Sequence, residues 1–113
     1  MTVARISIMR TSADLTRTAA DKKAEVERLL DDLEEYLSAQ TGYVLGFRFA
    51  NQEDEQEVDR VSLWGSHGDA DHAATQDRTM ALRSQIHALI DPGHLESLVD
   101  VTGNTKNIPA PHG

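Results

Sequence analysis

Two histidines and two aspartates fall within six residues, in the run His67-Gly68-Asp69-Ala70-Asp71-His72. Imidazole nitrogens and carboxylate oxygens are ligands for divalent metal ions, but ligands from one short run rarely converge without others from distant loops. The alternative is a helix start. Ser66 or Asp69 would then cap the helix, and the acidic side chains would lie near its positive end. We favour the helix start and predict no metal site.

Three residues nearby in sequence could act on an aromatic molecule. His72 can serve as a general base, a common role of histidine near neutral pH, or it can face solvent in a first helical turn. Trp64 can stack on a planar ligand, or it can fill space between two subunits. Arg48 can hold an anionic or enolate oxygen, or it can pair with Asp59 or Asp100.

Ser7 and Ser62 alternate in register with Trp64 along predicted strands, so they are candidate ligand contacts. Neither has a visible base beside it, and neither is predicted to be a nucleophile. His87 falls on a predicted helix and His94 follows the turn Asp91-Pro92-Gly93, where surface roles suffice for both.

The composition of the chain limits the kinds of partner that it can bind. The chain has 113 residues and a net charge of -8, with 19 acidic and 11 basic side chains. Such a surface repels phosphate backbones and anionic lipid, so we predict no nucleic-acid or membrane partner. Cysteine is absent, which excludes disulfides and thiolate catalysis. Arg5 and Arg10 interrupt the first apolar stretch, so it fits neither a signal peptide nor a membrane span, and we expect a cytoplasmic protein.

Hydrophobic spacing predicts the elements that position these residues. Period-two alternation predicts strands over 3–10, 43–50 and 58–64, and a short fourth strand near Leu98 to Val101. Spacings of three and four predict a helix that begins at Ser12 or Asp21 and stops at Gly42. A second helical pattern runs from about 69 to 90, with a break near 75–77.

The predicted order is β-α-β-β-α-β, which defines an α+β, ferredoxin-like fold: a four-stranded antiparallel sheet with the helices on one face. Residues 1–102 form this single domain. Residues 103–113 hold two prolines and two glycines and are predicted to be a tail, either flexible or crossing to a second subunit.

The two faces of the predicted sheet differ in polarity. We place the more apolar set beneath the helices (Ile6, Ile8, Leu45, Phe47, Val61 and Leu63). The opposite, mixed face then carries the remaining alternating residues (Ser7, Met9, Val44, Gly46, Arg48, Ser62 and Trp64). A half-apolar face with a tryptophan requires a partner, and a homodimer through this face is the economical one.

The element order, the glycine-containing strand "GYVLGFRF" and the segment "VSLWGSHGDADHAA" resemble the dimeric α+β barrel superfamily, and within it the antibiotic-biosynthesis-monooxygenase-like proteins. The resemblance covers roughly 3–102. It implies a homodimeric barrel with a pocket in each subunit. It also implies, for some members, oxidation of quinols or anthrones by molecular oxygen without a cofactor.

The haem-degrading branch of that superfamily has an asparagine on the first strand and a second tryptophan. This chain has no asparagine before Asn51 and one tryptophan, so haem degradation is not expected. Two hypotheses follow. The first is a cofactor-independent, monooxygenase-like enzyme for an electron-rich aromatic substrate, with His72 as base, Trp64 as platform and Arg48 as oxyanion partner. The second is a non-catalytic ligand-binding or accessory dimer on the same fold.

Overall fold

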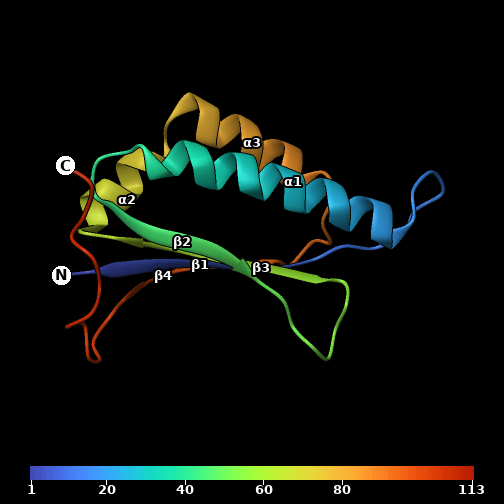
Figure 1. The fold of residues 1–113 in the computed structure, drawn as a ribbon. Helices are drawn as coiled ribbons and strands as arrows, with labels where there is room; N and C mark the ends of the chain where they lie inside the picture. The colour runs from blue at the N-terminus through green and yellow to red at the C-terminus, as the bar shows by residue number, and fades with distance from the viewer.

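The computed structural model describes residues 1–113. Its elements, in chain order, are β1 (Val3–Arg10), α1 (Ala19–Ser38), β2 (Tyr43–Phe49), β3 (Glu57–Trp64), α2 (His67–Ala74), α3 (Asp77–His87) and β4 (Leu95–Asp100). The four strands form one antiparallel sheet in the order β2-β3-β1-β4. Figure 1 shows all the helices on one face of this sheet. The predicted α+β, ferredoxin-like fold is confirmed.

The long helix α1 forms because apolar residues recur on the side that meets the sheet. Five residues of α1 at spacings of three and four are at most 4% exposed (Val26, Leu29, Leu30, Leu33 and Leu37). The helix begins later than Ser12 and earlier than Asp21, because the Thr18 side chain accepts the Asp21 backbone N–H and serves as N-cap. Gly42 is not its C-cap: the helix ends at Ser38, and Gly42, with φ of +86°, turns the chain into β2.

The second helical stretch is divided, as predicted, into α2 and α3. The Ser66 hydroxyl accepts the Asp69 backbone N–H at 3.1 Å, so Ser66 is the N-cap of α2. The acidic run therefore opens a helix, and its side chains turn to separate partners: His67 contacts Asp100, and Asp71 contacts Arg5. The run is thus a capped helix start, and its side chains do not converge on one point.

The prediction of which sheet face lies beneath the helices was wrong. Cross-strand partners share a face, and the register pairs Val3 with Trp64, Arg5 with Ser62 and Ser7 with Arg60. Both Val3 and Trp64 belong to the core that the helices cover. The mixed set, with Ser7, Met9, Ser62 and Trp64, therefore lies beneath the helices, and the apolar set (Ile6, Ile8, Leu45, Phe47, Val61 and Leu63) lies on the face without helices, which we call the open face.

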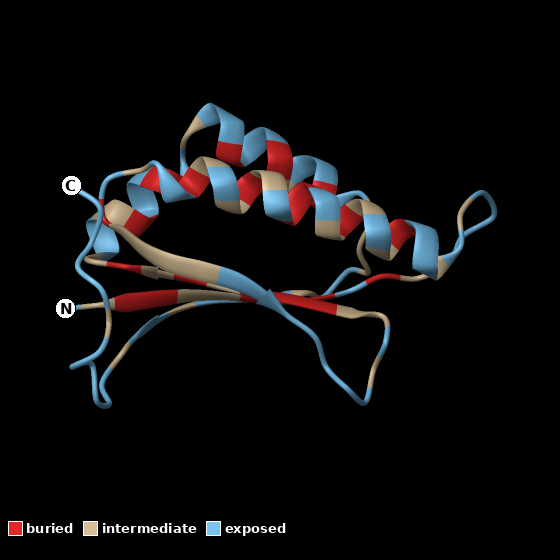
Figure 2. Cartoon of the chain, in the orientation of Figure 1, coloured by how far each residue is buried: buried red, intermediate tan, exposed pale blue.

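The exposed fractions of side chains on the open face show that no helix covers them. Phe47 is 52% exposed, Phe49 40% and Leu95 63%, although all three alternate on apolar sides of their strands. Figure 2 shows the buried residues on β1, on β3 and along α1, whereas the end of β2 is exposed. Alternation marks an apolar face but does not say which layer covers it.

The tail packs against the start of β2 in the same chain. The Gly42 backbone N–H donates to the His112 carbonyl at 2.7 Å, and the His112 N–H donates to the Tyr43 carbonyl at 2.6 Å. A side chain at Gly65 would meet Pro111, so the tail packs where β3 ends. None of the helices has both the length and the apolar character that a membrane crossing requires.

Candidate functional site: an arginine-lined cleft

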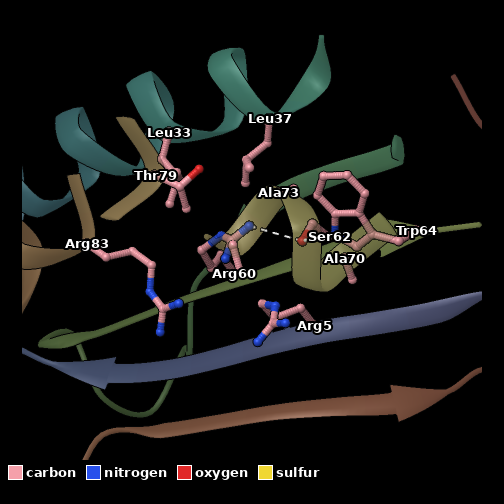
Figure 3. Close-up of a pocket in the computed structure, with 11 residues that line it drawn as sticks. Arg5, Leu33, Leu37, Arg60, Ser62, Trp64, Ala70, Ala73, Thr79 and Arg83 are labelled. Atoms are coloured by element: carbon pink, nitrogen blue, oxygen red, sulfur yellow. Dashed lines mark hydrogen bonds between the residues drawn. The ribbon is translucent and has the colours of Figure 1, made fainter. Parts of the chain in front are cut away.

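A small cleft lies between the sheet and the helices, beside Trp64. Figure 3 shows the Arg5, Arg60 and Arg83 side chains reaching one region from β1, β3 and α3. The cleft is lined by Arg5, Leu33, Leu37, Arg60, Ser62, Trp64, Ala70, Ala73, Ala74, Thr79 and Arg83. Its wall is therefore apolar and aromatic, and its floor is cationic.

Trp64 and Ser62 are fixed by a short hydrogen-bond chain on β3. The Trp64 indole N–H donates to the Ser62 hydroxyl at 3.0 Å, and the Arg60 guanidinium donates to the same oxygen at 3.1 Å. All three side chains are buried, with exposed fractions of 4% or less. The Tyr43 ring packs edge-on against the indole, with centroids 5.5 Å apart. The indole plane is thus held rigidly against the cleft.

Glu34 anchors α1 to this chain. Its carboxylate accepts the Tyr43 hydroxyl at 2.6 Å and the Arg60 guanidinium at 3.4 Å. It reaches the sheet because β2 has a glycine there: a Cβ at Gly46 would lie 1.6 Å from Glu34 Oε1. Burial, followed by the hydrogen bond to Glu34 and its negative charge, raises the pKa of the Tyr43 phenol. Tyr43 is therefore a hydrogen-bond donor here and not a base.

The other two arginines have carboxylate partners at the edge of the cleft. Arg5 contacts Asp71 at 3.4 Å, and Arg83 pairs with Glu96, which also accepts the Ser7 hydroxyl at 3.3 Å. The pKa of Arg5 is lowered, first by burial and then by the positive charge of Arg83. Two like charges in one poorly hydrated space favour an added anion.

Several polar atoms of the cleft have no protein partner. The Nε–H groups of Arg5 and Arg60 and the Thr79 hydroxyl are buried without a hydrogen bond. Unpaired buried donors are costly, and each gains free energy when an acceptor arrives. The cleft can therefore bind an oxygen acceptor, and a negatively charged one best.

The free space in this arrangement is small. The cavity has room for the centre of a water molecule within about 10 Å³, so it holds about one water. Binding sites for drug-sized molecules measure about 300–1,000 Å³. A ring-sized ligand therefore requires side chains or helices to move apart, and Arg83, on α3 and 28% exposed, lies at the edge.

The structure brings some of the sequence-predicted residues to this region. Trp64 and Ser62 line the cleft, and Ser7 lines an adjoining one that shares Leu33, Arg60 and Arg83 with it. They lie under the helices, not on the predicted subunit-facing side.

Two sequence-predicted residues do not line the cleft. His72 is exposed and contacts Gln76 at 3.2 Å. The expected pairing of Arg48 with Asp59 or Asp100 was wrong: Arg48 binds Glu27 and Asp31, each at 2.7 Å. The register explains this, because Arg48 pairs with Arg60 and so faces α1.

Sequence reasoning missed the three arginines. Arg5, Arg60 and Arg83 are far apart in the chain and form no motif. A signal was present for two of them, because Arg5 and Arg60 alternate in phase with Ser7, Ser62 and Trp64 along their strands. Arg83 carried no comparable sign.

Among the comparisons with known proteins, the one with solved structures finds matches to this fold. No protein-family model matches the chain, and no curated protein matches it either. Among solved structures, SnoaB, a cofactor-independent oxygenase from Streptomyces nogalater, superposes with a TM-score of 0.76 at 14% identity, covering 91% of this chain and 95% of that one. A conserved protein from Methanosarcina mazei gives 0.79 at 12% identity over 90% and 94%. An antibiotic biosynthesis monooxygenase gives 0.73 at 15% over 88% and 98%.

The chain therefore has the ferredoxin-like α+β fold of the antibiotic-biosynthesis-monooxygenase-like proteins, as the resemblance implied. At these identities the likeness shows the fold alone. What the cleft does follows from its own residues.

Proposed function

We propose that this protein binds an electron-rich aromatic molecule of the quinol or anthrone type in the arginine-lined cleft. The ring lies against Trp64, and its phenolate or enolate oxygen lies among Arg5, Arg60 and Arg83. The observation that carries the proposal is the convergence of three guanidinium groups beside a rigidly held indole. Planar guanidinium donors suit an oxyanion, and a buried site strengthens that attraction.

We further propose that the bound anion reacts with molecular oxygen. For an anthrone, one O₂ is consumed: one oxygen atom replaces the two methylene hydrogens as a new carbonyl, and the other leaves with those hydrogens as water. The enolate supplies the electrons, so no cofactor is required. The protein contributes electrostatic stabilisation of the anion and a space from which water is largely excluded.

Proton removal has two candidate routes. The carboxylates beside the cleft, Glu34 and Glu96, are engaged by Arg60 and Arg83. In the first route the arginines lower the pKa of the substrate, so that it binds already ionised. In the second, His72 acts as the general base, as the sequence suggests. The second route requires His72 to leave Gln76 and reach the cleft.

A non-catalytic ligand-binding or accessory role is the second candidate. Space for about one water molecule favours it, because such a cleft holds a small anion without rearrangement. Oxygen consumption separates the two candidates.

We also propose that the open face is covered by a second copy of the chain. Phe47, Phe49, Leu95 and Val99 are each at least 40% exposed on one side of the sheet. Contiguous apolar surface of this kind is typical of interfaces, and a self-complementary sheet face suits a two-fold dimer.

Oxygen uptake with a hydroxyanthrone tests the catalytic proposal. We expect uptake above the uncatalysed rate in the wild type and a loss of about 100- to 1,000-fold in Arg83→Gln, the scale of one lost oxyanion donor. Arg78→Gln, an exposed arginine of the same helix, is the matched control and should retain the wild-type rate. His72→Ala should retain it under the first route and lose it under the second. No uptake above background in the wild type would leave the non-catalytic candidate.

A further inference from the structure

A second cluster of ligating side chains lies away from Trp64, where α3 and β4 approach each other. His87 is the last residue of α3, His94 follows the next turn, and Glu96 lies on β4. One ligand atom from each of the three lies within 4.8 Å of the others. The histidine rings are close, with centroids 4.5 Å apart.

The local fold explains why the three residues meet. Gly93 has φ of +89°, a conformation that glycine adopts readily, and with Pro92 it reverses the chain after α3. The reversal returns His94 to the end of the helix. Glu96 pairs with Ser7 in the sheet and accepts its hydroxyl at 3.3 Å, so its carboxylate is on the helix-covered side. Two backbone elements and a tight turn thus hold the set together.

We propose that His87, His94 and Glu96 bind a divalent transition-metal ion, with Zn²⁺ as the representative. Two imidazoles and one carboxylate are a ligand set that such ions prefer over Mg²⁺ or Ca²⁺, which favour oxygen ligands. Ligand atoms around tetrahedral zinc are about 3.3 Å apart, at metal–ligand distances of about 2.0–2.1 Å. Side-chain rotations at this partly exposed cluster can close the remaining gap. Three protein ligands leave a fourth position for water or a small ligand.

Arg83 makes the proposed site distinctive. It pairs with Glu96, so its positive charge opposes an arriving cation. It is also a lining residue of both the arginine-lined cleft and the adjoining cleft, and the adjoining cleft is lined by His87 and Glu96 as well. A metal ion that neutralises Glu96 weakens its hold on Arg83. The proposed metal site does not depend on the proposed function. The effect of the metal ion on Arg83 in the arginine-lined cleft does rest on that function.

Calorimetric titration of the untagged, chelator-treated protein with Zn²⁺ tests the proposal. We expect one ion per chain at micromolar concentration. His87→Ala and His94→Ala should each lower the affinity at least about tenfold, because each removes a ligand. His112→Ala, in the tail, is the matched control and should bind as the wild type. Arg83→Gln should bind more tightly than the wild type, since it removes the opposing charge.

Co²⁺ absorption adds a readout of geometry. A visible band of the tetrahedral type should form in the wild type and be absent in His94→Ala. Circular dichroism checks that the variants fold. No binding by the folded wild type, or equal binding by His87→Ala, His94→Ala and His112→Ala, would overturn the site. The readout is metal binding alone, so its failure leaves the proposed aromatic ligand untouched.

Discussion

The two faces of the sheet differ in what they carry and in what covers them. The helix-covered face carries Arg5, Ser7, Arg60 and Ser62, whereas the open face carries aliphatic and aromatic residues such as Ile6 and Phe47. In a sheet that serves only its own subunit, the apolar face meets the helices and the polar face meets water. Here the helix-covered face mixes those polar side chains with core residues such as Val3 and Trp64, and the face without helices is the more apolar one. This difference motivates the two proposals made above, a ligand for the charged side chains beneath the helices and a second copy of the chain for the apolar face.

The largest expected effect comes from placing a charge on the open face. Phe47→Asp puts a carboxylate into the proposed apolar interface, twice in a two-fold dimer. We expect the dissociation constant of the dimer to rise by about 1,000-fold or more, equivalent to about 4 kcal/mol. Sedimentation velocity at micromolar concentration measures it. Phe47→Leu, the apolar control, should remain dimeric; a wild type that sediments as a monomer would refute the interface.

We also expect the stability to depend on pH, because Asp59 pairs with Ile8 and Phe49 and so lies on the open face. Asp59 is 2% exposed, and burial, followed by the neighbouring Glu57 carboxyl, raises its pKa to about 7. Between about pH 4 and pH 7 the unfolded chain has lost this proton while the native chain retains it. The stability contributed by the protonated form is therefore present at low pH and lost as pH rises toward 7, on the order of a few kcal/mol.

Asp59→Asn should abolish that loss. Urea unfolding at about pH 5 and about pH 8, at one protein concentration, compares the two proteins. Glu53→Gln, an exposed residue of the β2–β3 connection, is the control and should keep the wild-type slope. An Asp59→Asn protein with an unchanged slope would contradict the assignment.

A smaller effect is expected on the helix-covered face. In Gly46→Ala the new methyl group occupies the position of the Glu34 carboxylate, so Glu34 must release Tyr43 and Arg60 or the strand must shift. Overpacking of this kind costs about 1–3 kcal/mol. Thermal unfolding measures it, with Gly103→Ala, where a Cβ meets nothing within 4 Å, as control. Equal melting temperatures would show that Glu34 does not need this space.

The smallest effect concerns the helix α2, which covers Trp64. Ser66→Ala removes the side-chain acceptor for the Asp69 backbone N–H and should cost about 1 kcal/mol. Ser84→Ala, an exposed position of α3 without a side-chain hydrogen bond, should cost nothing by the same chemical denaturation assay. If the two variants are equally stable, the capping interpretation of the histidine–aspartate run is wrong.

The sequence predicted the element order and the break between α2 and α3, because each depends on local spacing and capping. It did not predict the facing of the sheet. Alternation along β1 identifies Ile6 as apolar and Arg5 as polar, and the usual rule then buries Ile6 under the helices. That rule fails here, because the helix-covered face carries Arg5 and Arg60 beside core residues such as Trp64.

The site was predicted in part for a related reason. Trp64 stands out in the sequence as a candidate aromatic platform, and Ser62 as a candidate ligand contact in phase with it on one strand. Arg83 does not, because only the packing of α3 on the sheet brings it to Arg5 and Arg60. Residues that meet only in the folded structure, from separate elements, form no local pattern in the sequence.

Fluorescence of Trp64 tests the central claim most directly, since it is the only tryptophan and lies in the cleft. The wild type, Arg83→Gln and Arg78→Gln are titrated with a hydroxyanthrone under nitrogen, so that no oxidation occurs. We predict saturable quenching in the wild type and Arg78→Gln, and an affinity at least about tenfold lower in Arg83→Gln, the scale of one lost charge-assisted hydrogen bond. Quenching that does not saturate, or equal affinities for the two arginine variants, would contradict a ligand site on the helix-covered face.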